Sequence, residues 1–389
     1  SATEMFGWFI GEGALVIPPS GAEKDPRMIL DYIERHKVTH VNFVPTMFRM
    51  FLELFDDPAN VCRLRSLKWI FIGGEAVTPD MVRKFHALGT DIRLENVYGP
   101  TECTIWMSHS PLHEPDIGTV TIGKPLNETR WYVVGDDNRL QPIGVPGELC
   151  LSGVGLARGY LNMDELTRSK FVPNPFYREG IDPEWFRLMY RTGDLARWLP
   201  NGDIQFLGRL DFQVKLRGIR IETAEIEHAL EARDDIIQAV CVVKELPNGS
   251  SGLCAYYLAD KAILDSELKE YLAGLLPAHM IPAWFVHRTD FPVNSSGKVD
   301  RNALAADQDY MRDKQPDHDE PTTELQSLIA SVWQEVLSVP RIGLDDTFFE
   351  AGGDSVSLIQ VHNKLMKQLG REFPLTLLLH QFVMNLNER

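Results

Sequence analysis

The sequence predicts a multidomain protein of the α/β and α+β classes that ends in a small all-helical domain. Three observations support this prediction. Strand and helix patterns alternate between residues 26 and 97, short strands and turns fill 118–209, and a second α+β pattern occupies 212–304. A charged linker and two helical patterns follow these parts.

The segment 26–97 has the repeating pattern of parallel β/α units. Helical apolar spacing is found in three stretches, 26–38, 46–55 and 78–89. Apolar, β-branched runs lie between or after them, at 38–44, 67–74 and 92–97. Pro79 near the start of the third helical stretch and Gly89 after its end agree with the usual helix boundaries. We therefore predict a parallel sheet covered by helices.

The remaining segments predict three further parts. In 118–209 the runs 128–134 and 147–153 read as short strands, and Asn201-Gly202 indicates a hairpin. Helices at 223–232 and 265–276 and strands at 236–246 and 253–260 indicate a small α+β domain. Helical spacing returns at 322–337 and 355–369 and, with a terminal apolar segment, indicates a small helical bundle. The predicted domains are 1–210, 211–305, a solvated linker at 306–321, and 322–389.

Composition limits the classes of function. The 389 residues carry a formal net charge of −16, which argues against a non-specific nucleic-acid binder or a polybasic membrane surface. The five cysteines form no CxxC pair, so we expect reduced, mostly buried thiols. The longest apolar run near the end, LTLLLHQFVM, is too short to span a bilayer. We expect a soluble, cytoplasmic protein that binds neither nucleic acid nor membrane.

The segment NVYGPTECT, 96–104, places polar side chains directly after a predicted strand. Ligands of α/β sheets collect at the carboxyl ends of strands. There Tyr98 offers a ring that can stack on a base, and Thr101 offers a hydroxyl for phosphate. Glu102 offers a carboxylate for a hard cation. Taken alone, the segment fits a turn with a helix cap equally well.

Two later segments carry charges suited to a nucleotide. Asp194 follows a glycine at a predicted strand end, where a carboxylate can accept two ribose hydroxyls, and Arg209 belongs to a basic span nearby. In NSSGKVDR, 294–301, Lys298 stands among small residues that let it approach an anion. This loop is not a Walker A motif, because the upstream glycine is missing. Taken singly, a salt-bridged basic loop and a solvated lysine are the plainer interpretations.

Together, seven segments in order resemble the core motifs of the adenylate-forming enzymes, specifically the adenylation domain of nonribosomal peptide synthetases. They are GEAV (74–77), NVYGPTE (96–102), GELCLSGVGLARGY (147–160), YRTGDL (190–195), GRLDFQVKLRGIRIE (208–222), LPAHMIP (276–282) and NSSGKVDR (294–301). The later DDTFFEAGGDSVSL (345–358) resembles a peptidyl carrier domain. The resemblance implies an incomplete large adenylation subdomain, a small α+β lid domain and an all-α carrier domain that is a four-helix bundle.

The resemblance also implies an activity and its cofactors. ATP, with Mg²⁺, would convert an amino acid to aminoacyl-AMP, which would pass as a thioester to a 4′-phosphopantetheine arm. The implied ATP- or AMP-binding residues are Gly74, Glu75, Ala76, Asn96, Tyr98, Thr101, Asp194 and Arg209. Glu102 would hold the metal, and Lys298 would bridge the substrate carboxylate and the α-phosphate. Asp211 matches the hinge of the small domain, and Gly218 the tunnel for the arm.

Ser355 is the implied attachment point of that arm. A separate phosphopantetheinyl transferase would modify it at the start of a predicted helix, where the helix dipole favours a phosphodiester. The alternative is that Ser355 only caps the helix. A hydrolase is excluded, because G-x-S-x-G would need glycine where Ser357 stands.

The family's phosphate loop, of the form SGTTGxPKG, has no counterpart here. The opening SATEMFGWF resembles the second half of a motif whose aspartate would clamp the substrate's amino group. We therefore expect the N-terminal part of the adenylation domain to lie elsewhere, on the same or a separate chain. We also expect that this polypeptide alone cannot form an adenylate.

The resemblance implies a substrate pocket but not the amino acid. Its residues would be Thr3, Asn42, Phe71, Gly73, Val97, Ile105 and Trp106. Phe71 and Trp106 take up volume, so we expect an amino acid with a small or medium uncharged side chain. Expected partners are the transferase, neighbouring condensation or release domains, and an accessory protein of the MbtH-like type. The alternatives are a catalytically silent carrier unit and a ligase that acts on free coenzyme A.

Overall fold

The structure of the chain is a computed structural model that describes residues 2–19, 21–114, 118–211, 213–216, 218–245, 251–294, 299–307, 321, 323–337, 342, 348, 353, 355–371 and 373. The chain divides into two compact units. The first comprises Ser1–Asp211 with Arg217–Ile219, and the second comprises Phe212–Leu216 with Arg220–Arg389. The division falls directly after Asp211, the predicted hinge. The hinge role and the domain boundaries stay predictions.

The first unit contains both of the predicted N-terminal parts. Its helices are α1 (Ala2–Ile10), α2 (Pro26–His36), α3 (Pro45–Glu53), α4 (Pro79–His86) and α5 (Asp164–Lys170), with short 3-10 helices η1 (Ala22–Lys24), η2 (Leu54–Asp56), η3 (Pro58–Leu64), η4 (Thr101–Cys103) and η5 (Glu184–Phe186). Its strands are β1 (His40–Phe43), β2 (Trp69–Gly73), β3 (Arg93–Tyr98), β4 (Ser108–Pro111), β5 (Lys124–Pro125), β6 (Thr129–Val134), β7 (Gly147–Gly153), β8 (Phe171–Pro173), β9 (Leu188–Trp198) and β10 (Ile204–Arg209).

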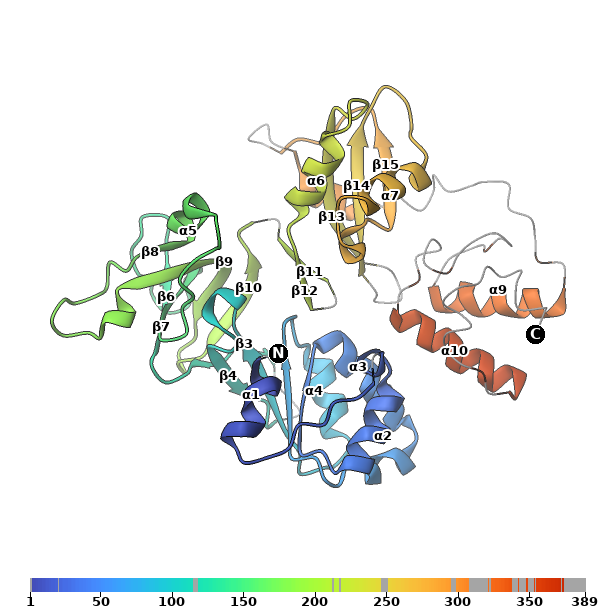
Figure 1. Ribbon diagram of the computed structural model, residues 1–389, viewed down its shortest axis with the longest axis horizontal. Coiled ribbons are helices and arrows are strands. Elements are labelled where there is room, and N and C mark those ends of the chain that lie inside the picture. Colours follow the sequence, from blue (N-terminus) through green and yellow to red (C-terminus); the bar gives the residue numbers. More distant parts are fainter. Residues whose placement is uncertain are drawn as a thin grey trace. The chain divides into compact units, whose positions relative to one another are not determined.

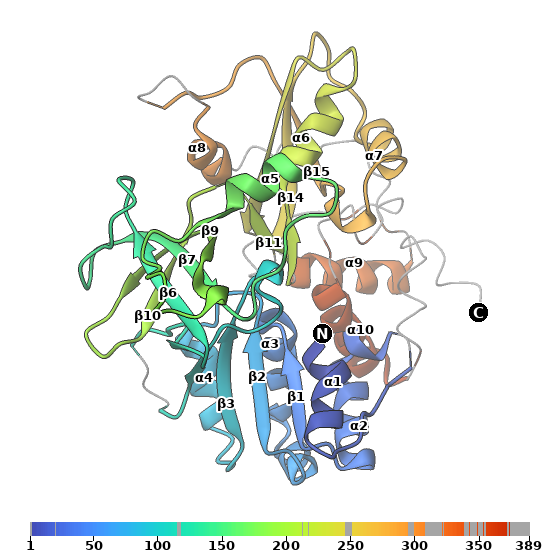
Figure 2. The same cartoon turned by 60° about the vertical axis from the view of Figure 1, so that its left-hand side comes forward.

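The predicted parallel β/α part is confirmed. β1, β2 and β3 are parallel neighbours (Figure 2), and β4 and β5 extend the same sheet antiparallel. One face of these strands packs on α2, α3 and α4 (Figure 1) through a core that includes Leu30, Phe48, Ile72 and Phe85. Burying a side chain of this size stabilises the fold by about 1.5–3 kcal/mol.

The starts of α2 and α4 follow from the local sequence. Asp25 accepts hydrogen bonds from the backbone N–H groups of Arg27 and Met28 at the start of α2. Thr78 accepts one from Met81 at the start of α4. These bonds satisfy N–H groups that the first helical turn leaves without a partner inside the helix.

The β-rich part of the first unit is an antiparallel sheet in the order β10-β9-β7-β6, with β8 paired to β9. β9 and β10 form the hairpin predicted from Asn201-Gly202, and Gly202 has a φ of 80°. Leu149, Tyr190 and Ile204 are fully excluded from solvent in the core of this sheet. The sheet is therefore anchored by its own core, separate from that of the parallel strands.

The second unit contains the predicted small domain and the predicted carrier. Its helices are α6 (Thr223–Glu231), α7 (Asp265–Ala273), η6 (Ala278–Met280), α8 (Arg301–Ala306), α9 (Glu324–Leu337) and α10 (Ser355–Leu369). The strands that follow Asp211 are β11 (Val214–Leu216), β12 (Ile219–Ile221), β13 (Gln238–Glu245), β14 (Ser251–Leu258) and β15 (Trp284–Arg288).

β13, β14 and β15 form the sheet of the small α+β domain. β13 and β14 are antiparallel, whereas β14 and β15 are parallel. Ile226 of α6 and Leu268 of α7 belong to one core of this domain. Tyr256, Trp284 and Leu304 belong to a second core, which includes α8. The predicted α+β class of this part is thereby confirmed.

The carrier part is described by two helices. α9 and α10 pack together through Trp333, Val336, Leu358 and Leu365, all nearly excluded from solvent. The other helices of the predicted four-helix bundle, including the terminal apolar segment, lie outside the described residues. Among the helices that the structure does describe, none is both long enough and apolar enough to cross a membrane.

Candidate functional site

The candidate site lies at the carboxyl ends of β2 and β3. After β2 the chain turns at Gly74, whose φ of 96° is one that L side chains rarely adopt. After β3 it turns at Gly99, where an added Cβ would lie 1.8 Å from the carbonyl oxygen of Ile105. Glycine at both turns thus allows these polar loops to leave the same edge of the sheet. Ile105, a predicted pocket residue, is half-buried at this edge.

Tyr98 and Asp194 meet in a buried hydrogen bond. The Tyr98 hydroxyl donates to Asp194 Oδ2, and the two residues are 7% and 3% exposed. Tyr98 ends β3 and Asp194 lies in β9, so the bond joins the two sheets of the first unit. Burial raises the pKa of the Tyr98 hydroxyl well above its ordinary value, and the charge of Asp194 raises it further. The backbone N–H of Asp194 also donates to Thr192 Oγ1 at 2.9 Å.

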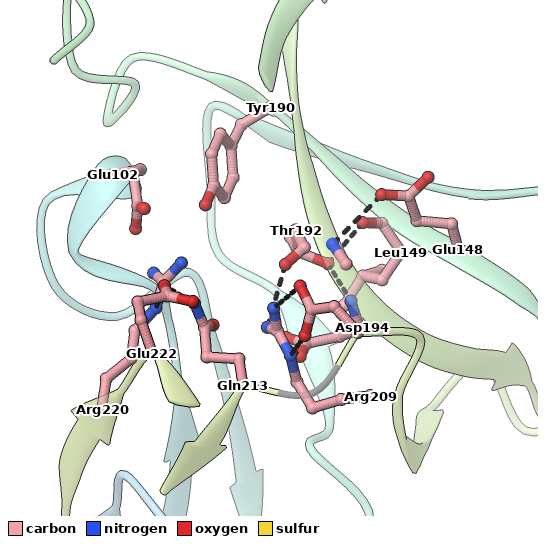
Figure 3. A network of polar contacts seen from close by, with 12 residues as sticks. Glu102, Glu148, Leu149, Tyr190, Thr192, Asp194, Arg209, Gln213, Arg220 and Glu222 are labelled. Atoms are coloured by element: carbon pink, nitrogen blue, oxygen red, sulfur yellow. Dashed lines mark hydrogen bonds and ion pairs between the residues drawn. The ribbon is translucent and has the colours of Figure 1, made fainter. Parts of the chain in front are cut away.

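Arg209 holds the other side of Asp194 (Figure 3). Its Nη1 donates to Asp194 Oδ1 at 2.7 Å and to the carbonyl oxygen of Thr192 at 2.9 Å. Its Nε and Nη2 donate to the two Asp211 oxygens at 2.8 and 2.6 Å. Burial opposes the charge of Arg209, but the hydrogen bonds and charges of the two aspartates raise its pKa overall. Because a carboxylate oxygen has two lone pairs, Asp194 can still accept ribose hydroxyls.

Glu102 is a buried carboxylate on η4, beside the exposed Thr101. Its Oε1 accepts a hydrogen bond of 2.6 Å from the Tyr160 hydroxyl, and its carbonyl oxygen accepts one of 2.8 Å from Ala157 N–H. No group of three or more His, Cys, Asp or Glu that could hold a metal occurs among the described residues. A Mg²⁺ ion held by one carboxylate and nucleotide phosphates fits this donor set.

Glu75 has a role that the sequence did not reveal. Its Oε2 accepts hydrogen bonds from the N–H and hydroxyl of Thr46 at 3.1 and 2.7 Å, and its Oε1 accepts one of 2.6 Å from Gly218 N–H. An added Cβ on Gly218 would lie 2.5 Å from Cγ1 of Val44, so only glycine fits there. Ala76, the next predicted residue, is exposed. In the sequence, the one sign of this role was that Glu75 stands in a predicted turn with no basic residue next to it.

Five of the predicted pocket residues lie together. Asn42 is paired with Phe71, and Gly73 with Val97, across the parallel strands. Because side chains alternate along a strand, these four positions share one face of the sheet. The rings of Phe71 and Trp106 are 5.0 Å apart. An added Cβ on Gly73 would lie 2.5 Å from the Val97 carbonyl oxygen, so this position tolerates no side chain.

The aromatic surface beside these residues is larger than predicted. His40 of β1 and Trp69 of β2 stack on Phe71, with ring centroids 6.5 and 5.8 Å away. His40, Trp69 and Phe71 lie at alternate positions on the paired strands β1 and β2, so the sequence could have indicated that their rings share one face. We predicted a parallel sheet covered by helices, and that expectation left no reason to look for partly exposed rings on these strands.

The remaining predicted residues are placed less fully. Asn96 lies in β3, where its Nδ2 donates to the carbonyl oxygen of Thr121 at 2.7 Å. Thr3 lies in α1 and Ser355 begins α10, but the side chains of both are outside the description. Lys298 lies outside the described residues altogether.

Gly353, two positions before Ser355, is fixed on the core of α9. Gly353 N–H donates to the Phe348 carbonyl oxygen at 2.8 Å. An added Cβ on Gly353 would lie 2.3 Å from the Phe348 ring, and that ring stands edge-on to Trp333 with centroids 4.9 Å apart. Ser355 therefore begins α10 two positions after a tightly packed glycine, and a helix start favours a phosphodiester.

A cavity in the first unit lies away from these residues. It measures about 530 Å³ and is lined by residues that include Lys68, Trp69 and Arg93. Trp69 and Arg93 begin β2 and β3, whereas Gly73 and Tyr98 end them. The cavity is therefore at the opposite edge of the sheet from the candidate site.

Family comparisons agree with the chemistry at both ends of the chain. Residues 1–161 match the AMP-binding enzyme family, and residues 327–383 match the phosphopantetheine attachment site. The chain combines an AMP-binding domain with a phosphopantetheine attachment site. The AMP-binding match includes Tyr98 and Glu102, and the attachment-site match includes Ser355.

The homologues of this AMP-binding and carrier chain include nonribosomal peptide synthetases. It is 43% identical over 380 residues to a component of mycosubtilin synthase from Bacillus subtilis, covering 96% of this chain and 14% of that protein. It is 41% identical over 391 residues to a component of linear gramicidin synthase from Brevibacillus parabrevis, covering 100% of this chain and 7% of that protein. The chain thus spans a small part of these relatives.

Solved structures support the same assignment. One is a holo nonribosomal peptide synthetase protein with adenylation and PCP domains bound to a vinylsulfonamide inhibitor. It matches with a TM-score of 0.71 and 26% identity, over 89% of this chain and 55% of that one. The predicted adenylate-forming fold is confirmed. AMP-binding enzymes use ATP and Mg²⁺, and the attachment site takes phosphopantetheine, which confirms the predicted cofactors.

Proposed function

We propose that the chain supplies residues with which a nonribosomal peptide synthetase module activates an α-amino acid as its adenylate and passes the aminoacyl group to an arm on Ser355. The observation that carries this proposal is the buried network of Tyr98, Asp194 and Arg209. Its members come from three separate motifs, and their chemistry suits a ribose and its phosphate.

In this proposal the network binds the nucleoside. Asp194 accepts the ribose hydroxyls, because hydrogen bonds from Tyr98 and Arg209 hold its carboxylate in place. Adenine lies against Tyr98 and the backbone of 74–76, and Arg209 assists the ribose or phosphate. Since no side chain has to reorganise, this preorganisation is available before the reaction begins.

The phosphates are assigned to the loop after β3. Thr101 donates to phosphate, Glu102 holds Mg²⁺, and Lys298 bridges the substrate carboxylate and the α-phosphate. Mg²⁺, when bound, neutralises phosphate charge. The work left to these side chains is positioning and charge stabilisation, which dominate catalysis of phosphoryl and adenylyl transfer.

The pocket and the second step complete the proposal. The contact between Phe71 and Trp106 limits the space beside Asn42, which favours a small or medium uncharged side chain. Asp211 is assigned to the hinge, and Gly218 to the tunnel of the arm. The aminoacyl group would pass from the adenylate to the arm's thiol, which loses its proton, as the bond to AMP breaks and AMP leaves. The transferase, condensation or release domains and an MbtH-like protein are the proposed partners.

Intact mass tests both halves of the proposal on the 389-residue chain. The chain is first incubated with a broad phosphopantetheinyl transferase and coenzyme A. ATP, Mg²⁺ and a pool of amino acids are then added. We expect the mass of one arm to be gained, to be absent in Ser355→Ala, and to persist in Ser331→Ala, which removes an exposed serine of the same domain.

Each result separates the proposal from its alternatives. A further ATP-dependent gain from one amino acid supports adenylation and loading by this chain, and it should disappear in Lys298→Ala. An arm without that gain agrees with the expectation that this polypeptide alone forms no adenylate. If a co-purifying chain that carries the phosphate loop restores the gain, the synthetase module is favoured, and if it does not, the carrier unit is favoured. An acyl-coenzyme A in solution, with no acyl group on the chain, favours the coenzyme A ligase.

A further inference from the structure

We infer that Tyr160 is a positioning residue that orients the Glu102 carboxylate for a divalent cation bound to a nucleoside triphosphate. The inference rests on the proposed role of Glu102. Its basis is the hydrogen bond of 2.6 Å from the Tyr160 hydroxyl to Glu102 Oε1, between residues 58 positions apart. Tyr160 belongs to the GELCLSGVGLARGY segment, to which no side-chain role has been assigned so far.

Tyr160 is itself held in one orientation. Its backbone N–H donates to Thr167 Oγ1 at 2.9 Å, and its ring stands edge-on to Phe171 with centroids 5.7 Å apart. Its hydroxyl lies 3.4 Å from that of the fully buried Tyr190, which Figure 3 shows beside Glu102. Because the Tyr160 proton points to Glu102, Tyr190 is the donor in this second contact. The carboxylate therefore meets a preorganised donor.

Two further contacts tie the same segments together. Ala157 N–H donates to the Glu102 carbonyl oxygen at 2.8 Å, and Thr104 Oγ1 donates to the Gly155 carbonyl oxygen at 2.7 Å. Thr104 has a φ of 79°, which is unusual for a β-branched residue and is sustained by its surroundings. The short η4 helix alone does not fix Glu102. Its position depends on the segment that ends in Tyr160.

The chemistry of the donor also suits a metal ligand. Glu102 is 8% exposed, so its charge needs a hydrogen-bond donor. An arginine or lysine in place of Tyr160 would neutralise the carboxylate and weaken its attraction for a cation. A neutral hydroxyl fixes the carboxylate and leaves its charge in place. Outer partners of this kind orient the carboxylates that ligate metals.

The test is the binding of Mn²⁺ together with the α,β-methylene analogue of ATP, measured by electron paramagnetic resonance on the full chain. Tyr160→Phe keeps the ring on Phe171 and removes only the hydroxyl. We expect the Kd of Mn²⁺ to rise roughly tenfold in this variant, with the metal-free affinity for the analogue unchanged. The matched control is Tyr132→Phe, which removes a buried hydroxyl of β6 that accepts a hydrogen bond from Asn174. This control should bind Mn²⁺ as the wild type does.

Glu102→Gln separates a failure of the Tyr160 inference from a failure of the proposed metal-binding role of Glu102. If Glu102→Gln loses Mn²⁺ but Tyr160→Phe binds it normally or more tightly, Tyr160 does not position the carboxylate, and the role of Glu102 stands. If Glu102→Gln binds Mn²⁺ as the wild type does, or the wild type binds none, the metal role of Glu102 fails and the inference fails with it. An equal loss in Tyr132→Phe also overturns the inference, because the effect is then not specific to Glu102.

Discussion

Arg209 and Asp211 form a two-pronged ion pair at the point where the chain leaves the first unit. The Arg209 Nε and Nη2 atoms donate to the two carboxylate oxygens of Asp211 at 2.8 and 2.6 Å. The residue between them, Leu210, donates its N–H to the carbonyl oxygen of Gly193 at 2.8 Å. The last residues of the unit are therefore fixed to β9, and through Arg209 to Asp194.

Asp211→Asn should loosen this end of the unit. The Asp211 side chain is 39% exposed, so the pair contributes at most about 1 kcal/mol. We expect amide hydrogen exchange at 208–216 to become roughly twofold to fivefold faster. The matched control is Asp235→Asn, because Arg233 and Asp235 form the same two-pronged pair at the same spacing. Equal acceleration at 208–216 in both variants, or none in Asp211→Asn, contradicts a role for the pair in holding the chain.

Local sequence predicted the elements whose patterns are long. The helix over 26–38 and the hairpin at Asn201-Gly202 were confirmed, because each depends on spacing or turn chemistry within a few residues. β5, which is only Lys124–Pro125, was missed because two residues carry no pattern. The small helix α8 was missed for the same reason.

The motifs named the candidate residues but not their contacts. Tyr98 was predicted as a stacking ring, yet its hydroxyl bonds to Asp194, 96 positions later in the chain. The bond from Tyr160 to Glu102 was equally hidden. Such pairs depend on how two sheets meet, which no local pattern encodes. The sequence therefore predicts which residues carry chemistry, and the tertiary structure decides how they are held.

Tyr98→Phe should change how the stability of the protein depends on pH, because it removes the buried hydroxyl. Below the ordinary tyrosine pKa of about 10 the variant should be less stable by about 1.5–3 kcal/mol, because Asp194 loses a donor to its charge. The pKa of Tyr98 is raised in the fold, so above about pH 10 the unfolded wild type releases a proton that the folded protein keeps. The wild type loses stability there, whereas the variant has no hydroxyl to titrate.

The difference in unfolding free energy between the wild type and Tyr98→Phe should shrink by about 1.4 kcal/mol for each pH unit above about 10. Urea unfolding at a series of pH values, followed by tryptophan fluorescence, measures this difference. Parallel pH curves for the two proteins would show that Tyr98 is not held protonated by the fold.

Lys244→Met should open the end of α8. The buried Lys244 Nζ donates to the carbonyl oxygens of Leu304, Ala305 and Asp307, which close this helix. Removing the ammonium leaves these carbonyls without their donor, so we expect a loss of about 2–4 kcal/mol in unfolding free energy. Hydrogen exchange at 299–307, directly after the segment that contains Lys298, should accelerate first.

Lys84→Met is the control for this variant. Lys84 pairs with Asp80 at 3.3 Å on the exposed face of α4, and such a pair contributes about 0.5 kcal/mol or less. If Lys244→Met costs no more stability than Lys84→Met, the three carbonyl contacts do not hold α8 to β13.

Gly353→Ala should slow the modification of Ser355 without changing the serine. The new Cβ would lie 2.3 Å from the ring of Phe348, a residue of the core that fixes α9. Relief of this clash requires Gly353 to move or the ring to repack, at a cost of about 1–3 kcal/mol. We expect the rate of arm attachment, followed by intact mass, to fall roughly tenfold. Gly118→Ala is the control, since nothing lies within 4 Å of its added Cβ. An unchanged rate in Gly353→Ala would show that the packing at Gly353 does not present Ser355 to the transferase.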